Sequence, residues 1–181
     1  RGREGTTSYL EKMGAELGFA VHIVKPVKIN GQIVSSSRVR ELIELGQVEK
    51  AAEFLGRPYS LAGPVIHGVK TGGKIGFPTA NIDTKHVQVP GAGVYAVYII
   101  CAGQRHRGVV NVGFNHTFHR DRLVVEVHIL DFHEAIYGKE IEIEFIKRIR
   151  SEIEFQSADE LVAQIKKDIE TAQTLLEEQP S

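Results

Sequence analysis

Six short apolar segments in the middle of the chain constrain its fold more than any other feature. They are β-branched or alternate apolar with polar residues, and Gly, Asn, Asp or Pro separates them. The predicted strands are Leu61–His67, Ala80–Asp83, Gly93–Cys101, Gln104–Val112, Leu123–Phe132 and Lys139–Arg150. Ala102-Gly103 is a tight link between two of them. Strands this close, with no helix between most of them, favour a mainly β, antiparallel barrel.

A helix is predicted after the last strand. Ser157 and Glu160 have the spacing of a capping box. The apolar stripe that follows is Leu161, Ile165, Ile169, Ala172 and Leu176. A stripe with this period predicts a face that packs against the barrel.

The first part of the chain has a different pattern. Apolar residues from Tyr9 to Leu17 predict a helix, and Phe19–Val24 predicts a short buried strand before Pro26. One helix and one strand cannot bury their apolar faces alone, so we expect an α/β remnant of a larger unit with further residues upstream. We place the domain boundary after residue 56, giving domains 1–56 and 57–181.

A serine run opens the next predicted helix. Ser37 is the expected N-cap, Val39, Leu42 and Ile43 are apolar, and Gly46 ends the helix. A second helix ends at Gly56 and Pro58. From these residues alone, capping explains the serines better than ligand binding does.

Composition limits the class of partner. The single cysteine, Cys101, excludes an internal disulfide and a Cys-based zinc site, and residues 1–10 lack the apolar core of a secretory signal. There is no apolar run near the length of a membrane span, so we expect a cytoplasmic protein with no membrane partner. Residues 1–150 carry 20 basic and 15 acidic side chains, a modest excess that suits a phosphorylated small molecule better than nucleic acid.

A glycine-rich stretch, GVKTGGKIGFPTAN from Gly68 to Asn81, is the candidate phosphate site. Glycine lets backbone N–H groups approach an anion, and the loop carries two lysines. Thr79 and Asn81 offer oxygen ligands of the kind that Mg²⁺ accepts beside phosphates. The loop is not a Walker A motif, because Ile75 follows Lys74 where Ser or Thr is needed. A glycine hairpin that binds nothing is the alternative. The loop residues considered for phosphate binding are Gly68, Lys70, Gly72, Gly73, Lys74 and Gly76.

The segment LVVEVHILDF, from Leu123 to Phe132, is the strand that could carry chemistry. Side chains alternate between its faces, which places Glu126 between apolar neighbours and next to His128. Desolvation of such a carboxylate raises its pKa and makes it a candidate general base. An edge glutamate paired with Lys or Arg is the alternative. His128 is interpreted as a structural neighbour.

Several motifs together resemble one family. The blocks HGVKTGGKIGFPTANI, PGAGVYAVYI, GVVNVGFNHTF, VEVHILDF and IYGKEIEIEFIKRIRSEIEF occur in this order between Gly56 and Leu176. They resemble the riboflavin kinase domain of bacterial bifunctional riboflavin kinase/FAD synthetases. Upstream, VSSSRVR resembles the ISSTxIR-type signature that ends the FMN adenylyltransferase module of these enzymes.

The resemblance implies a six-stranded Greek-key barrel that transfers the γ-phosphate of ATP to the ribityl 5′-hydroxyl of riboflavin, giving FMN and ADP. It implies that the loop wraps the nucleotide phosphates, that Thr79 and Asn81 bind Mg²⁺ and phosphate oxygens, and that Glu126 is the base. The flavin-binding residues that it implies are Asn111, Gly113, Arg150, Glu152 and Phe155. The remnant of the adenylyltransferase site would be Ser35, Ser36, Ser37, Arg38 and Arg40.

The sequence departs from the family at several points. Thr71-Gly72-Gly73 stands where the family has RGR, and His116 replaces a proline. The HxGH-type motif of a Rossmann-like adenylyltransferase module is absent, so we expect this chain alone to make FMN and not FAD. Two other classes were weighed: a flavin-binding barrel without catalysis, and an oligonucleotide-binding barrel. The absence of Trp and an aromatic content of 7% disfavour the last.

Overall fold

The computed structural model describes residues 6–67, 76–85, 87–114 and 123–177. The chain separates into two compact units, Arg1–Val34 and Ser35–Ser181. In the first unit, the Thr6 side chain caps helix α1 (Thr7–Leu17), which ends at Gly18 with φ of +76°. A hairpin of β1 (Lys28–Ile29) and β2 (Gln32–Ile33) follows.

The predicted strand at Phe19–Val24 is wrong. The described residues of the first unit pair only β1 with β2, and the side chains of Phe19 and Val24 are 52% and 85% exposed. An apolar segment becomes a strand only where a neighbouring strand accepts its backbone hydrogen bonds, and residues 19–24 have no such neighbour here. The Rossmann-like origin of this unit therefore stays a prediction.

The second unit begins with two short helices, α2 (Ser36–Glu44) and α3 (Val48–Leu55). The N-cap of α2 is Ser35, whose side chain accepts a hydrogen bond from Arg38 N, so the prediction of Ser37 was two residues late. Helix α3 packs on the barrel. Helix α2 is held by a backbone hydrogen bond, in which Gly91 N donates to Ile43 O at 3.0 Å. The structural division thus falls after Val34, while the module boundary after residue 56 stays a prediction.

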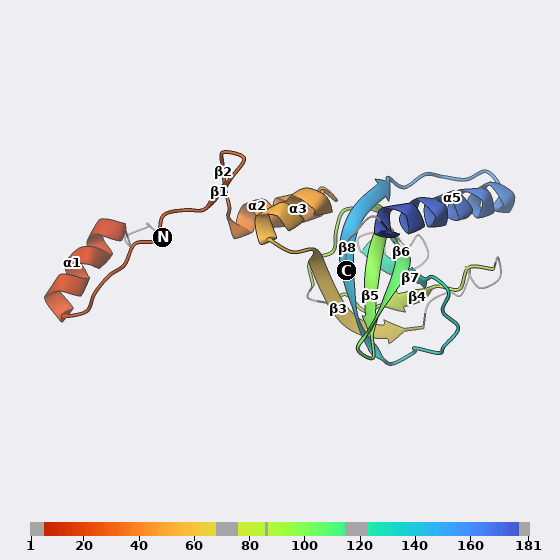
Figure 1. Ribbon diagram of the computed structural model, residues 1–181, viewed down its shortest axis with the longest axis horizontal. Coiled ribbons are helices and arrows are strands. Elements are labelled where there is room, and N and C mark those ends of the chain that lie inside the picture. Colours follow the sequence, from red (N-terminus) through yellow and green to blue (C-terminus); the bar gives the residue numbers. More distant parts are fainter. Residues whose placement is uncertain (1–5, 68–75, 86, 115–122, 178–181) are drawn as a thin grey trace. The chain divides into compact units, whose positions relative to one another are not determined.

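Six antiparallel strands form a closed barrel in the order β3-β4-β7-β6-β5-β8 (Figure 1). Their bounds are Tyr59–Ile66 (β3), Ala80–Ile82 (β4), Gly93–Cys101 (β5), Gln104–Phe114 (β6), Leu123–Ile129 (β7) and Glu140–Arg150 (β8). The predicted six-stranded antiparallel barrel is confirmed. The turn between β5 and β6 is Ala102-Gly103, both with positive φ, which suits the right-handed twist of a hairpin.

The inside of the barrel is filled by a core of buried side chains. Val97, Val110, Val125, Ile143 and Phe145 are fully buried in one continuous cluster. Because strand residues alternate, the neighbours of these core residues point outward. Any binding site on these strands therefore lies on the outer face.

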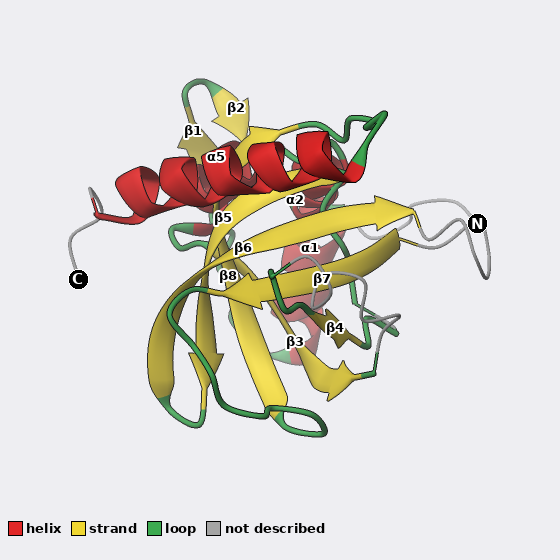
Figure 2. Ribbon diagram, turned by 90° about the vertical axis from the view of Figure 1, so that its right-hand side faces the viewer, coloured by secondary structure: helices red, strands yellow, loops and turns green. Residues whose placement is uncertain are grey.

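Helix α5 (Ala158–Glu177) covers part of that outer face (Figure 2). One half of its predicted capping box is present, because Glu160 N donates to Ser157 Oγ at 3.2 Å. The Glu160 side chain accepts instead from Gln156 N, one residue before Ser157, at 3.0 Å. At the other end, Ala172 and Leu176 are buried against Ala96 and Tyr98. The Tyr98 hydroxyl donates to Leu176 O at 2.7 Å, which holds the end of the helix on β5.

Candidate active site

One row of side chains crosses five strands on the outer face of the barrel. Cross-strand pairing places Asn81 (β4) opposite Glu126 (β7), and Glu126 opposite Asn111 (β6). The same register continues from Asn111 to Val94 (β5) and on to Arg150 (β8). Directly opposed residues share a face of the sheet, so Glu126 lies between two amides. A register of this kind brings together residues from five separate motifs.

Glu126 is half-buried, and burial raises the pKa of its carboxyl group above the ordinary value, while a side-chain hydrogen bond from Asn81 opposes the shift. A carboxylate can only accept hydrogen bonds, so the Asn81 amide nitrogen faces Glu126. The amide oxygen of Asn81 is thereby turned away from the carboxylate. That oxygen takes no part in the bond to Glu126.

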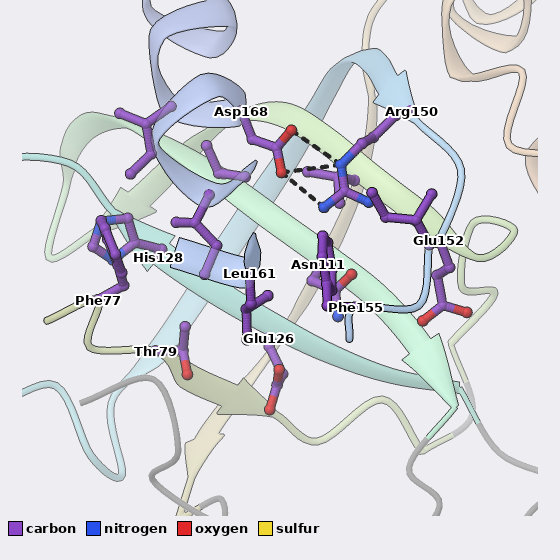
Figure 3. Close-up of a pocket in the computed structure, with 15 residues that line it drawn as sticks. Phe77, Thr79, Asn111, Glu126, His128, Arg150, Glu152, Phe155, Leu161 and Asp168 are labelled. Carbon is purple, nitrogen blue, oxygen red and sulfur yellow. Dashed lines mark hydrogen bonds and ion pairs between the residues drawn. The ribbon is translucent and has the colours of Figure 1, made fainter. Parts of the chain in front are cut away.

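A cavity of about 270 Å³ opens over this row, beneath the first turns of α5 (Figure 3). Its floor comes from the barrel, and its apolar walls come from α5 and from the segment that precedes the helix. Among the lining residues, the polar ones are Thr79, Asn111, Glu126, His128, Arg150, Glu152 and Asp168. The apolar ones are Phe77, Val94, Val109, Ile153, Phe155, Leu161, Ile165 and Ile169. An apolar cavity with a few convergent polar groups is the usual form of a small-molecule site.

The prediction that the whole stripe of α5 packs on the barrel was therefore wrong for its first half. Leu161, Ile165 and Ile169 line the cavity, whereas Ala172 and Leu176 pack against β5. The periodicity of a helix identifies its apolar face but not whether a protein surface or a ligand covers that face.

A buried ion pair ties α5 to the last barrel strand at the level of the cavity. Arg150 Nε contacts both carboxylate oxygens of Asp168, at 3.0 and 3.1 Å, and Nη2 contacts Oδ2 at 2.8 Å (Figure 3). The Asp168 side chain is only 4% exposed. Gln164 also donates to Asp168, at 2.8 Å. Sequence reasoning missed Asp168, although an acidic residue directly before Ile169 in an apolar stripe is a signal that could have found it.

Gly113 and Glu152 meet at the open side of the cavity. A Cβ atom at Gly113 would stand 2.0 Å from Glu152 Oε1, so the carboxylate occupies the space that a side chain would fill. A side chain at this position would therefore displace the exposed Glu152 carboxylate. Gly113 is not itself among the lining residues, but it lets Glu152 reach the cavity.

The predicted site residues divide into three groups. Glu126, Thr79, Asn111, Arg150, Glu152 and Phe155 line one cavity, and Asn81 bonds to Glu126. Gly68, Lys70, Gly72, Gly73 and Lys74 lie outside the described residues, as do Thr71 and His116, while Gly76 is described with φ of +89°.

None of Ser35, Ser36, Ser37, Arg38 and Arg40 lines this cavity. Ser35 caps α2, and Arg38 pairs with Glu41 at 2.7 Å. Capping and an exposed ion pair give these two residues structural roles here. Their predicted origin in an adenylyltransferase site stays a prediction.

The donor atoms near Glu126 suit a hard cation. Within the described residues, no group of three or more His, Cys, Asp or Glu converges as a metal site. Thr79 and Glu126 line the cavity together, and Asn81 adds an amide oxygen. Hydroxyl, carboxylate and amide oxygens are ligands that Mg²⁺ accepts beside substrate phosphates, so these side chains fit that ion.

The model of the riboflavin kinase (flavokinase) family matches residues 55–176, which contain the barrel strands, the cavity and nearly all of α5. The chain belongs to the riboflavin kinase family. The match includes every residue that lines the candidate active site.

Curated relatives carry the same domain within longer chains. A bifunctional riboflavin kinase/FMN adenylyltransferase of Haemophilus influenzae is 40% identical over 171 residues, covering 94% of this chain and 56% of the relative. One from Listeria monocytogenes is 42% identical over 167 residues, covering 91% and 53%. The chain thus spans slightly more than half the length of these relatives.

A solved structure supports the fold over most of the chain. A Streptococcus pneumoniae protein, described as a macrolide-efflux protein, superposes with a TM-score of 0.85 and 36% identity over 94% of this chain and 55% of that one. That description does not match the family model or the curated relatives, which agree with each other. Only the fold is therefore carried over from this structure. In the part of the chain that the structure describes, no helix has the length and apolar character needed to cross a membrane.

Proposed function

We propose that this chain binds riboflavin in the cavity beneath α5 and transfers the γ-phosphate of ATP to the ribityl 5′-hydroxyl. The observation that carries the proposal is the position of Glu126, between two amides at the polar end of the cavity that Thr79 also lines. The apolar wall from α5 suits a flat aromatic ring system. The polar end suits a hydroxylated chain whose terminal oxygen must lose a proton.

The residues divide the chemistry as follows. Glu126 accepts the proton of the ribityl hydroxyl while the hydroxyl oxygen forms a bond to the γ-phosphorus. The bond between the γ-phosphorus and the oxygen that bridges it to the β-phosphorus breaks, which releases ADP. A pKa raised by burial brings the base closer to the working pH. Mg²⁺, when bound, neutralises phosphate charge, and Thr79 and Asn81 are the residues that would hold it. Most of the remaining catalysis is positioning.

Two further points belong to the proposal. The relatives named above join a kinase to an FMN adenylyltransferase, so we propose that the full protein also carries that module and adenylylates FMN to FAD. A cytoplasmic location agrees with the single cysteine, Cys101, which is buried and unpaired.

The test is to incubate the chain with riboflavin, ATP and Mg²⁺ and to separate the flavins by chromatography. FMN as the product supports the kinase. FAD would show that this chain also has adenylyltransferase activity. Tight flavin binding, seen as fluorescence quenching, without any phosphorylated product would overturn the proposal in favour of a binding module without catalysis.

A further inference from the structure

We infer that His128 is a positioning residue for this site, and that its Nδ1–H holds the backbone just before Thr79 in place beside Glu126. The inference deepens the proposed function and rests on it. It concerns a histidine that the sequence pattern had suggested was only a neighbour of the base.

The contact that carries the inference joins β7 to the segment before β4. His128 Nδ1 lies 2.8 Å from Pro78 O. A carbonyl oxygen can only accept a hydrogen bond, so Nδ1 must carry a proton. The neutral ring is therefore the Nδ1–H tautomer, with Nε2 unprotonated.

The position of this bond in the sheet explains what it does. The ladder between β4 and β7 has three pairs, and its last pair toward the cavity is Ala80 with Val127. Thr79 and Pro78 lie beyond that pair, so no backbone ladder fixes them. The hydrogen bond from the His128 imidazole to Pro78 O adds one more contact between β7 and the segment before β4, and a side chain makes it in place of a paired strand.

The ring itself is held in place from the other side. Phe77 packs edge-on against His128, with ring centroids 5.9 Å apart and planes at 79°. Phe77, Thr79 and His128 all line the cavity (Figure 3). Because His128 Nδ1–H donates to the carbonyl oxygen of the Pro78–Thr79 peptide, the bond sets the plane of that peptide and so the direction of the Thr79 side chain.

The consequence is a rigid link between two parts of the site. Glu126 and His128 share the outer face of β7, since they are two residues apart on one strand. Glu126 is the base on that strand, and Thr79 and Asn81 are the proposed ligands for phosphate and metal. His128 keeps the distance between these two groups fixed, and a loose link of this kind costs catalysis much more than it costs folding.

Three substitutions separate this role from general packing. Asparagine places its amide nitrogen near the position of Nδ1, whereas glutamine places its amide nitrogen near Nε2. His128→Asn should keep the bond to Pro78 O, and His128→Gln and His128→Leu should lose it. His128 also lines the cavity, so riboflavin binding without nucleotide is measured in all three variants, and we expect it to change less than Mg·ADP binding in His128→Gln and His128→Leu.

We expect loss of the hydrogen bond to Pro78 O to weaken nucleotide binding more than riboflavin binding. In His128→Leu and His128→Gln, the KM for Mg·ATP should rise roughly tenfold, equivalent to about 1.4 kcal/mol, while His128→Asn stays close to wild type. The dissociation constant of Mg·ADP, measured by calorimetry, should follow the same order. A failure of Asn to rescue, or an equal loss of riboflavin and nucleotide binding in all variants, would overturn the inference.

A second measurement tests the contact without any activity. Nitrogen-15 NMR of the imidazole in the wild-type protein should report the Nδ1–H tautomer for the neutral ring of His128. The Nε2–H tautomer would contradict the hydrogen bond to Pro78 O directly. A wild-type chain that makes no FMN but has the Nδ1–H tautomer and the predicted order of Mg·ADP affinities would refute the proposed function and leave the positioning role standing.

Discussion

The substitution Asp168→Asn should destabilise the barrel unit and loosen the cavity, because it breaks the buried ion pair between α5 and β8. Removing one partner from a buried pair leaves an unpaired charge and costs about 3–5 kcal/mol. Two features reduce this cost. The Arg150 side chain is 20% exposed, and asparagine can keep one of the hydrogen bonds. We therefore expect a loss of about 2–3 kcal/mol in the free energy of unfolding.

The matched control is Glu177→Gln, near the other end of the same helix. Glu177 pairs with Arg107 at 3.0 Å, but their side chains are 68% and 37% exposed. An exposed pair contributes less than about 1 kcal/mol. Urea denaturation followed by circular dichroism compares the two variants directly. A cost for Asp168→Asn as small as that for Glu177→Gln would refute the reasoning.

Flavin affinity provides the second readout. Ile165 and Ile169 lie on either side of Asp168 in the chain and line the cavity, so a loosened helix should weaken riboflavin binding, whereas Glu177→Gln should not. The double variant Arg150→Met/Asp168→Leu should recover stability, because apolar side chains often replace a buried pair without loss. If riboflavin affinity stays low in that stable double variant, Arg150 also contacts the flavin, as predicted from the sequence.

Three further predictions concern the same unit. Gly113→Ala should raise the KM for riboflavin with little change in stability, since its Cβ displaces only the exposed Glu152 carboxylate; equal KM values would contradict this. Tyr98→Phe should cost about 1–3 kcal/mol in thermal or urea unfolding, because Leu176 O loses its buried donor. The pH profile of kcat/KM should fall on the acid side, at a pH above the ordinary range for a glutamate. Burial raises the pKa of Glu126, and only its deprotonated form is a base; an acid limb at the ordinary glutamate pKa would count against this role.

The sequence was sufficient to predict the barrel, and it placed Glu126 on the opposite strand face from Val125 and Val127. Alternation along Leu123–Ile129 predicted which residues share a face, and the structure buries Val125 and Val127 in the core while Glu126, on the other face, is half-buried. Turn residues such as Ala102-Gly103 fixed where strands end. These features depend on short-range geometry, which a sequence pattern carries directly.

The composition of the site depended on long-range register, which sequence periodicity does not reveal. Asn81 and Asn111 flank Glu126 only because β4 and β6 pair with β7 in one particular alignment. The role of Asp168 likewise depends on α5 crossing the end of β8 beside Arg150. Family resemblance identified several of these residues, but it gave no reason for their proximity.

Errors arose where local signals had more than one structural outcome. Phe19–Val24 is apolar enough for a strand, yet the described residues offer it no partner strand. Each serine in the run from Ser35 to Ser37 can cap a helix, and the backbone selects the first of them. The stripe on α5 looked like a single packing face, but half of it forms the wall of a cavity.

The most direct test of the account is the rate at which Glu126→Gln converts riboflavin to FMN, compared with wild type, with riboflavin and ADP binding measured on the same samples. Glutamine is nearly isosteric and can still accept the Asn81 hydrogen bond, and it removes a partly buried charge, so folding should be intact. We predict that kcat falls by roughly 100- to 10,000-fold, the range for loss of a general base, while both ligands still bind. Full activity in this variant would contradict the assignment of Glu126 as the base.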